Sequence, residues 1–411
     1  MRPILPDPAD RPEPSPEPGT AAQTSRTPPS PARIYLDHHA TTPVDPRVAA
    51  LMVGVMTEDF GNPNSAQHAW GQDAARVMLD AAVAVARLVG AQPDGVRFTS
   101  GASEALRLAL AYACDRKGGA PLLVAASRVE HPALIDELRA GERDGRYRIV
   151  WMPVDGKGRV LMDTVRAALK AKVDLFCLQA ANNEVGTIQP FGEAAALAQA
   201  SGAEVLVDAT QAAGRIPLSM AESGVDYLVL SGHKIYGPKG VGALVGPDLA
   251  EMPPPSRYAF HNATPNVPGI AGMGEACRLR LLEMAEDEVR IAALRDLMQA
   301  RLQEALPALV VNGDQDARLS NNLHISIPGA QNDIVVANLR SEVAISTGAA
   351  CMAGVDAPSH VLQAMGLEPW RLDSALRISL GRTTTAEDVR RAGTLLITVL
   401  EQVQTPIESA A

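Results

Sequence analysis

Five short apolar segments alternate with amphipathic helical patterns between residues 95 and 231, and this alternation limits the chain to few fold classes. Strands that are separated by helices usually build one sheet of mainly parallel strands, which the helices cover. The sequence therefore predicts a large α/β domain. Its predicted strands are GVRFTS (95–100), PLLVAAS (121–127), DLFCLQ (174–179), EVLVDA (204–209) and DYLVLS (226–231).

Later segments predict a second, smaller unit that contains both strands and helices. HISI (324–327) and LRISLG (376–381) have the composition of strands in another sheet. Helical patterns lie near 274–306 and 385–404. We expect these elements to form an α+β domain, and no internal repeat is visible.

Residues 1–32 differ from the rest in being rich in proline, acidic and small residues. Such a segment cannot bury enough apolar area to offset its ordering entropy, so it is predicted to be a disordered tail. It has no hydrophobic run typical of a secretion signal, and its acidic residues disfavour an organelle transit peptide. We expect a cytoplasmic protein.

The charge and the cysteines exclude several classes of protein. A net charge of -10 over 411 residues disfavours nucleic acid and anionic membranes as partners, and no run of apolar residues is long enough for a transmembrane helix. The four cysteines are far apart, which disfavours a zinc site or a disulfide framework. Cys114, Cys177 and Cys277 lie in apolar surroundings and are predicted to be buried, whereas Cys351 lies in STGAACMAG, typical of a mobile or exposed loop.

Polar residues follow each predicted strand of the large domain. In open parallel sheets, ligands bind in the crevice beside the carboxyl ends of the strands, so these residues would converge on one site. The clusters are Ser100 to Ser103, Glu130-His131, Asn182 to Glu184, Asp208 to Gln211, and Ser231 to Lys234.

Each cluster taken alone also has a structural interpretation. The helix start after FTSGAS suits a phosphate, with Ser103 adding a hydroxyl, and it equally suits a serine N-cap with Glu104 in the first turn. Asp208 needs a partner, which is either a pyridinium N–H or the amides of a turn. For both lysines of SGHKIYGPKG, the default interpretation is a solvated side chain at the surface. Isolated histidines and amides are more often structural than catalytic, and this applies to His131, Asn183, Gln211 and His233.

Taken together, the motifs resemble the cysteine desulfurases of the NifS/IscS type, in the class V branch of fold-type I pyridoxal-phosphate (PLP) enzymes. The resemblance covers the chain from residue 34 to the C-terminal helices. The matching stretches are IYLDHHATTPVDPRV (34–48), FGNPNSAQHAWG (60–71), FTSGASEA (98–105), VEHPA (129–133), NNEVGTIQP (182–190), VDATQAAGRIP (207–217), LSGHKIYGPKGVGAL (230–244), STGAACMAG (346–354) and LRISLGR (376–382).

The resemblance implies a fold, a cofactor and partners. The fold would be a large domain with a mainly parallel seven-stranded sheet, over 48–265, and a smaller α+β domain made of 33–47 and 266–411 that carries the Cys351 loop. The cofactor would be pyridoxal 5'-phosphate and the substrate L-cysteine. The enzyme would be a homodimer that passes sulfur to an acceptor protein.

The resemblance also implies a role for individual residues. Lys234 would bind PLP covalently and remove the Cα proton, Asp208 would pair with the pyridine nitrogen, and His131 would stack on the ring. Cys351 would attack the substrate sulfur as a thiolate and then carry it as a persulfide. Asn183 and Gln211 would contact the phenolic oxygen, and Asn183 would also reach the substrate. Arg377 would contact the substrate carboxylate. The phosphate would contact Ala102, Ser103, Ser231 and His233.

Two departures from the family pattern keep alternatives open. Ala105-Leu106-Arg107 stands where the family usually has Ser-Asp-Asn, and the stretch 251–269 is shortened and rewritten. Thr264, within that stretch, could still reach the phosphate of a partner subunit. One alternative is another class V enzyme resembling selenocysteine lyase, and the second is a weakly active, partner-activated scaffold for sulfur transfer. Cys351 in a long loop favours the desulfurase.

Overall fold

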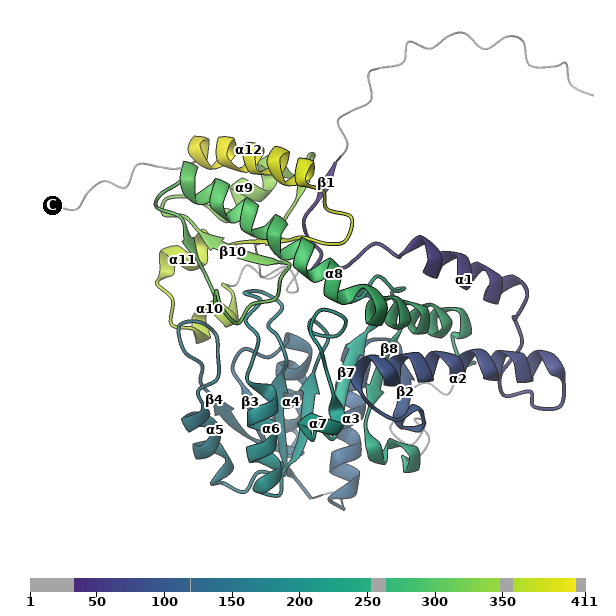
Figure 1. Ribbon diagram of the computed structural model, residues 1–411. Helices are drawn as coiled ribbons and strands as arrows, with labels where there is room; N and C mark the ends of the chain where they lie inside the picture. The colour runs from purple at the N-terminus through teal and green to yellow at the C-terminus, as the bar shows by residue number, and fades with distance from the viewer. Residues whose placement is uncertain (1–32, 119, 253–263, 348–357, 404–411) are drawn as a thin grey trace, which may run out of the picture. The chain divides into compact units, whose positions relative to one another are not determined.

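The computed structural model describes residues 33–118, 120–252, 264–347 and 358–403 (Figure 1). Residues Arg33–Ala411 form one compact unit. The predicted tail (1–32) and Cys351 lie outside the described residues.

A seven-stranded sheet forms the centre of this unit, in the order β2-β8-β7-β6-β5-β3-β4 (Figure 1). Only β8 is antiparallel to its neighbours, so the predicted mainly parallel sheet is confirmed. The strands are β2 (Val96–Thr99), β3 (Leu122–Ser127), β4 (Tyr147–Met152), β5 (Leu175–Gln179), β6 (Glu204–Asp208), β7 (Tyr227–Ser231) and β8 (Gly242–Val245). Five of them lie within the five apolar segments predicted as strands, whereas β4 and β8 were not among those segments.

Helices cover both faces of this sheet because successive strand residues point to opposite sides. On β6, Val205 and Val207 pack into one core and Leu206 into another. The first core includes residues of α2 (Ala69–Val89), α5 (Met162–Leu169) and α6 (Phe191–Ala200). The second includes residues of α3 (Ala102–Arg116) and α4 (Pro132–Arg143). Both faces of the strands are therefore apolar, and polar side chains gather at the strand ends.

A three-stranded antiparallel sheet, β12-β10-β9, has its own hydrophobic core. Its strands are β9 (Val310–Val311), β10 (Asn322–Ser326) and β12 (Leu376–Ser379), and the core includes residues of α9 (Asn332–Leu339) and α12 (Ala386–Val403). The second predicted sheet is therefore present. The exact division into two domains remains a prediction.

The longest helix, α8 (Val267–Ala305), contributes to both cores. Met273 packs with the large sheet, while Met298 packs with the small one. It begins before the predicted helix near 274–306, because the Asn266 side chain accepts a hydrogen bond from Gly269 N–H and Pro268 occupies its first turn.

Short elements complete the fold. β1 (Ile34–Tyr35) pairs in parallel with β11 (Val343–Ala344). The remaining elements are α1 (Pro46–Thr57), α7 (Met220–Ser223), α10 (His360–Ala364), α11 (Pro369–Asp373) and the 3-10 turns at Pro93–Gly95, Gly232–Lys234 and Pro247–Glu251. None of the helices in the described residues has the length and apolar composition needed to cross a membrane.

Two cysteine predictions are confirmed and one is only partly right. Cys177 and Cys277 are fully buried, and burial raises the pKa of both thiols. Cys114 is only partly buried on α3. Burial still raises the pKa of its thiol, so it remains a poor nucleophile.

A substitution of the buried Arg280 tests how much its ion pairs and hydrogen bond stabilise α8. Its guanidinium is 1% exposed and pairs with Asp287 at 2.5 Å and Glu288 at 2.8 Å, and its Nε donates to Gly214 O at 2.8 Å. Arg280→Ala removes the cation from Glu288, while Asp287 keeps Arg382 Nε at 2.8 Å, so we expect a loss of about 3 kcal/mol in the free energy of unfolding. Urea unfolding measures this.

Arg278→Ala is the matched control, because Arg278 is an exposed arginine on the same helix that pairs with Glu275. It should cost less than about 1 kcal/mol. Equal losses for the two variants would show that the buried pairing does not matter.

Candidate active site

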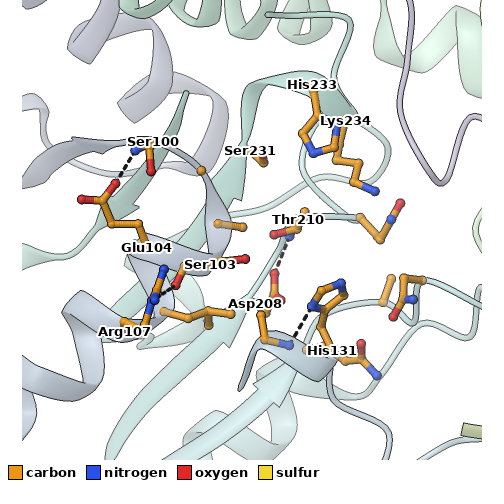
Figure 2. Close-up of a pocket in the computed structure, with 18 residues that line it drawn as sticks. Ser100, Ser103, Glu104, Arg107, His131, Asp208, Thr210, Ser231, His233 and Lys234 are labelled. Carbon is orange, nitrogen blue, oxygen red and sulfur yellow. Dashed lines mark hydrogen bonds between the residues drawn. The ribbon is translucent and has the colours of Figure 1, made fainter. Parts of the chain in front are cut away.

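A pocket of about 240 Å³ lies at the carboxyl ends of β2, β3, β5, β6 and β7 (Figure 2). These five strands point the same way, so the polar residues that follow them meet there. Thr264 and Arg377 do not line it, and Cys351 lies outside the described residues. The predicted residues that do line it are Ala102, Ser103, His131, Asn183, Asp208, Gln211, Ser231, His233 and Lys234.

Lys234 ends a 3-10 turn that follows β7 directly, which carries its side chain to the pocket. Its Nζ donates hydrogen bonds to the carbonyl oxygens of His39 and, at 3.0 Å, of Ala40. Both carbonyls belong to the segment between β1 and α1. Lys239, by contrast, is exposed. The two lysines of SGHKIYGPKG are thus separated, and only Lys234 is placed for chemistry.

Asp208 is the last residue of β6 and is 7% exposed. One carboxylate oxygen accepts the Thr210 N–H at 2.9 Å. A carboxylate can accept several hydrogen bonds, so this turn amide leaves capacity for a donor in the pocket. The two interpretations of Asp208 are therefore compatible.

His131 caps the start of α4, where its Nδ1 accepts the Ala133 N–H at 3.1 Å. The neutral ring then carries its proton on Nε2. Burial lowers the pKa of His131, Asp208 raises it, and Lys234 lowers it further. Figure 2 shows His131, Asp208 and Lys234 around the same pocket. A neutral, immobilised ring of this kind can support a flat aromatic ligand.

The start of α3 closes another side of the pocket. Its N-cap is Gly101, and no side chain caps it, so the interpretation of a serine N-cap is wrong. Ser103 is exposed in the first turn, where backbone N–H groups have no partner within the helix and favour an anion. Ser231 is buried nearby, and His233 Nδ1 lies 3.1 Å from Thr41 Oγ1. Burial, with help from Lys234 and Lys239, lowers the pKa of His233 to about 4.

Asn183 is presented by a tight turn after β5. Asn182 Oδ1 accepts the N–H groups of Glu184 at 2.8 Å and Val185 at 2.9 Å. Gly186 closes the turn with φ of +73°, and a Cβ there would lie 2.4 Å from the Asn322 side chain. Glycine is therefore required on both counts. The turn holds Asn183 at the pocket wall.

Arg377 lies on β12 beside the pocket rather than in its lining, and it is 1% exposed. Its Nη1 donates to Asn183 O at 3.0 Å and its Nη2 to Asp37 Oδ1 at 2.9 Å. Its Nε has no partner among the described residues. The arginine therefore touches the main chain of a pocket residue and keeps one donor available.

Two contributors were not predicted, and a third, Glu130, was predicted only as a member of the Glu130-His131 cluster, with no role of its own. Gln179 lines the pocket as the last residue of β5, so the rule of polar strand ends could have identified it. His39 acts through its carbonyl oxygen, which accepts from both Lys234 and Gln211 Nε2, and no side-chain pattern indicates that. Glu130 is fully buried behind His131; its Oε1 accepts from Ser127 Oγ and, at 3.1 Å, from Gln179 N–H.

The pocket fits a phosphorylated aromatic aldehyde. It combines an amine, a carboxylate with spare acceptor capacity, a fixed imidazole and an uncapped helix start. Three buried polar atoms of lining residues have no partner in the described part of the chain, namely Asn183 Oδ1, Thr210 Oγ1 and Gln211 Oε1. Within the described ranges, no cluster of three or more His, Cys, Asp or Glu side chains offers a metal site.

Comparison with known proteins agrees with this chemistry. The class-V aminotransferase family model matches residues 34–392. A cysteine desulfurase of Frankia sp. (strain EuIK1) is 40% identical over 396 residues, which are 92% of this chain and 93% of that protein. The chain belongs to the cysteine desulfurases of class V. Membership in this family implies pyridoxal phosphate as the cofactor.

Two further comparisons cover nearly the whole chain. The cysteine desulfurase IscS of Anaeromyxobacter sp. (strain Fw109-5) is 37% identical over 371 residues, which are 89% of this chain and 91% of that protein. The solved structure of a NifS-like protein superposes with a TM-score of 0.81 at 30% identity, covering 90% of this chain and all of that one. The predicted fold-type I architecture is therefore confirmed.

Glu130 gives this site a measurable pH signature in the protein without cofactor. Burial raises the pKa of Glu130 from 4.5 to about 8, although the Ser127 and Gln179 hydrogen bonds oppose the shift. Between these values the unfolded chain releases a proton that the folded chain keeps, so stability falls as pH rises. Glu130→Gln should remove this falling contribution from the urea-derived stability between pH 5 and 8, which makes the slope less negative or more positive by up to about 1.4 kcal/mol per pH unit.

Glu142→Gln is the control, because Glu142 is exposed near the end of α4, the helix that begins just after Glu130. It should leave the slope as in the wild type. A Glu130→Gln profile parallel to the wild-type profile would contradict the assignment.

Proposed function

We propose that this protein is a PLP-dependent L-cysteine desulfurase. It would convert L-cysteine to L-alanine and pass the sulfur through Cys351 to an acceptor protein. The observation that carries this is the convergence of Lys234, Asp208 and His131 on one pocket, in a chain of the cysteine desulfurase family. The roles predicted for the individual site residues are part of this proposal.

The chain's residues would hold the cofactor from four sides. Lys234 would bind its aldehyde carbon, Asp208 would accept the pyridinium N–H, and His131 would support the ring face. The phosphate would lie at the start of α3, with Ala102, Ser103, Ser231 and His233 around it. Asn183 and Gln211 would flank the phenolic oxygen. When bound, PLP supplies an electron sink for the substrate Cα.

The remaining steps are proton and sulfur transfers by this chain's residues. Lys234 Nζ would take the proton from the substrate Cα, because its amine is the base at the pocket wall. Arg377, with Nε still unpartnered among the described residues, would orient the substrate carboxylate. The Cys351 thiolate would form a bond to the substrate sulfur while the Cβ–S bond breaks, its electron pair staying with the alanine fragment.

Two variants test the proposal through separate readouts. Lys234→Ala should lose the visible absorption of lysine-bound PLP and lower alanine release from L-cysteine by at least about 100-fold. Cys351→Ser should keep the absorption and lose the persulfide detected by mass spectrometry, because only the sulfur relay is removed.

Lys239→Ala is the matched control, since Lys239 is the exposed lysine of the same motif. It should resemble the wild type in both readouts. A colourless wild type after PLP addition would refute the enzyme, and full sulfide release by Cys351→Ser would refute the persulfide route. Equal turnover of L-selenocysteine and L-cysteine without persulfide would favour the lyase alternative.

We further propose that the enzyme is a homodimer. Large apolar side chains are exposed on α1, in the turn after it and on α2, and a monomer would leave them in water. Thr264 is exposed and does not line the pocket of its own chain, which is consistent with a role at the phosphate of the partner subunit. The exposed side chains are Leu51, Val53, Met56, Phe60, Trp70 and Leu79.

A charge on this apolar surface should weaken the dimer. Trp70→Glu places a carboxylate where an indole is 58% exposed, so we expect at least a tenfold rise in the dimer dissociation constant by sedimentation equilibrium. Leu161→Glu is the control, because Leu161 is 49% exposed just before α5. Equal effects of the two substitutions would argue against this surface.

A further inference from the structure

Two pairs of neighbouring residues, Glu130-His131 and Asn183-Glu184, face both the pocket and helix α10. His131 and Asn183 line the pocket. The other member of each pair binds the start of α10. Glu130 O lies 2.9 Å from His360 Nε2, and Glu184 Oε2 accepts the hydroxyl of Ser359. Helix α10 is thus bonded directly behind two walls of the pocket.

Apolar contacts strengthen the attachment of α10. Val129 and Val185 each lie next to one of these pairs. They pack in one small core with Val361 and Leu362 of α10 and with Met365, which directly follows that helix. All five side chains are buried. The helix is therefore packed against the two loops that present His131 and Asn183.

Ser359 is the key polar contact of α10 because its hydroxyl group both donates and accepts a hydrogen bond. Its Oγ accepts the Leu362 N–H at 3.1 Å as the N-cap of α10, and it donates to the buried Glu184 carboxylate. Glu184 is 4% exposed, and burial raises its pKa while the Ser359 hydrogen bond lowers it. Removing the hydroxyl would leave both a helix start and a buried carboxyl without their partner.

The chain that enters the segment 348–357 is held differently. Ser346 exchanges two main-chain hydrogen bonds with Arg377, of 3.1 and 2.7 Å. Main-chain bonds survive side-chain substitution. The exit of the segment, at Ser359, is held by the side-chain hydrogen bond to Glu184, and Cys351 precedes Ser359 by eight positions.

We propose that Ser359 and Glu184 are positioning residues for sulfur transfer. Their hydrogen bond sets where the chain that carries Cys351 rejoins the fold, relative to the His131 and Asn183 walls of the pocket. It thereby sets how well the Cys351 thiolate reaches the substrate sulfur, so that the S–S bond forms as the Cβ–S bond breaks. This inference rests on the proposed function.

The experiment compares Ser359→Ala with Ser219→Ala in the full-length holoenzyme. Ser219 caps the short helix α7 in the same way, accepting the Glu222 N–H at 3.3 Å, and it does not line the pocket. Single-turnover persulfide formation on Cys351 should slow by about tenfold in Ser359→Ala. The KM for L-cysteine and the affinity for PLP should stay within about twofold of the wild type.

Substitutions at Glu184 separate positioning from general damage. Glu184→Gln keeps an oxygen that accepts the Ser359 hydroxyl and should be close to the wild type. Glu184→Ala should match Ser359→Ala, and the double variant should be no slower than either, because both remove one interaction. A loss of PLP affinity in parallel with the persulfide rate would overturn the proposal.

A second readout does not depend on turnover. In the protein without cofactor, alkylation of Cys351 by iodoacetamide, followed by peptide mass spectrometry, should change at least threefold in Ser359→Ala and not in Ser219→Ala. Equal alkylation in these two variants would overturn the positioning role. If the wild type forms no persulfide, the proposed function fails, and the alkylation comparison still decides the role of Ser359.

Discussion

Six strands of the central sheet run in one direction, and this shared direction brings polar turns from distant parts of the chain to one edge. The strands are apolar on both faces because helices cover both sides. A charged side chain such as Asp208 is therefore tolerated only at a strand end, where turn amides can bond it. The pocket is a consequence of the same burial that stabilises the sheet.

The segment between β1 and α1 joins the pocket to the smaller sheet. The His39 carbonyl accepts from Lys234 and Gln211, and Asp37 pairs with Arg377 of β12. Main-chain and short side-chain contacts of this kind place the amine of Lys234 against a fixed surface. A residue far from Lys234 in the sequence thus controls its orientation, because a carbonyl oxygen is available from any amino acid.

The predictable parts of the fold and site are those where side-chain type carries the information. The strands at β5, β6 and β7 follow from runs of apolar residues, and the positions of Asp208 and Lys234 follow from the ends of those runs. The apolar stretch of β8, GALV, is short and contains a glycine, so it did not stand out as a strand. Contacts made by the main chain, such as Asn183 O to Arg377, also leave no pattern in the sequence. The family resemblance suggested Arg377 as a substrate ligand, but its pairing with Asp37 depends on how two sheets meet.

Buried carboxyl groups at an active site are costly unless each has specific donors. Glu130 receives Ser127 Oγ–H and Gln179 N–H, and Glu184 receives Ser359 Oγ–H. Both groups lie one residue away from a side chain that lines the pocket. An apolar residue could fill the same space, but it would not fix the direction of the neighbouring loop. The directional hydrogen bonds of Glu130 and Glu184 therefore explain why carboxyl groups stand behind the pocket: they orient His131 and Asn183, and the cost of their burial appears as a raised pKa of both carboxyls.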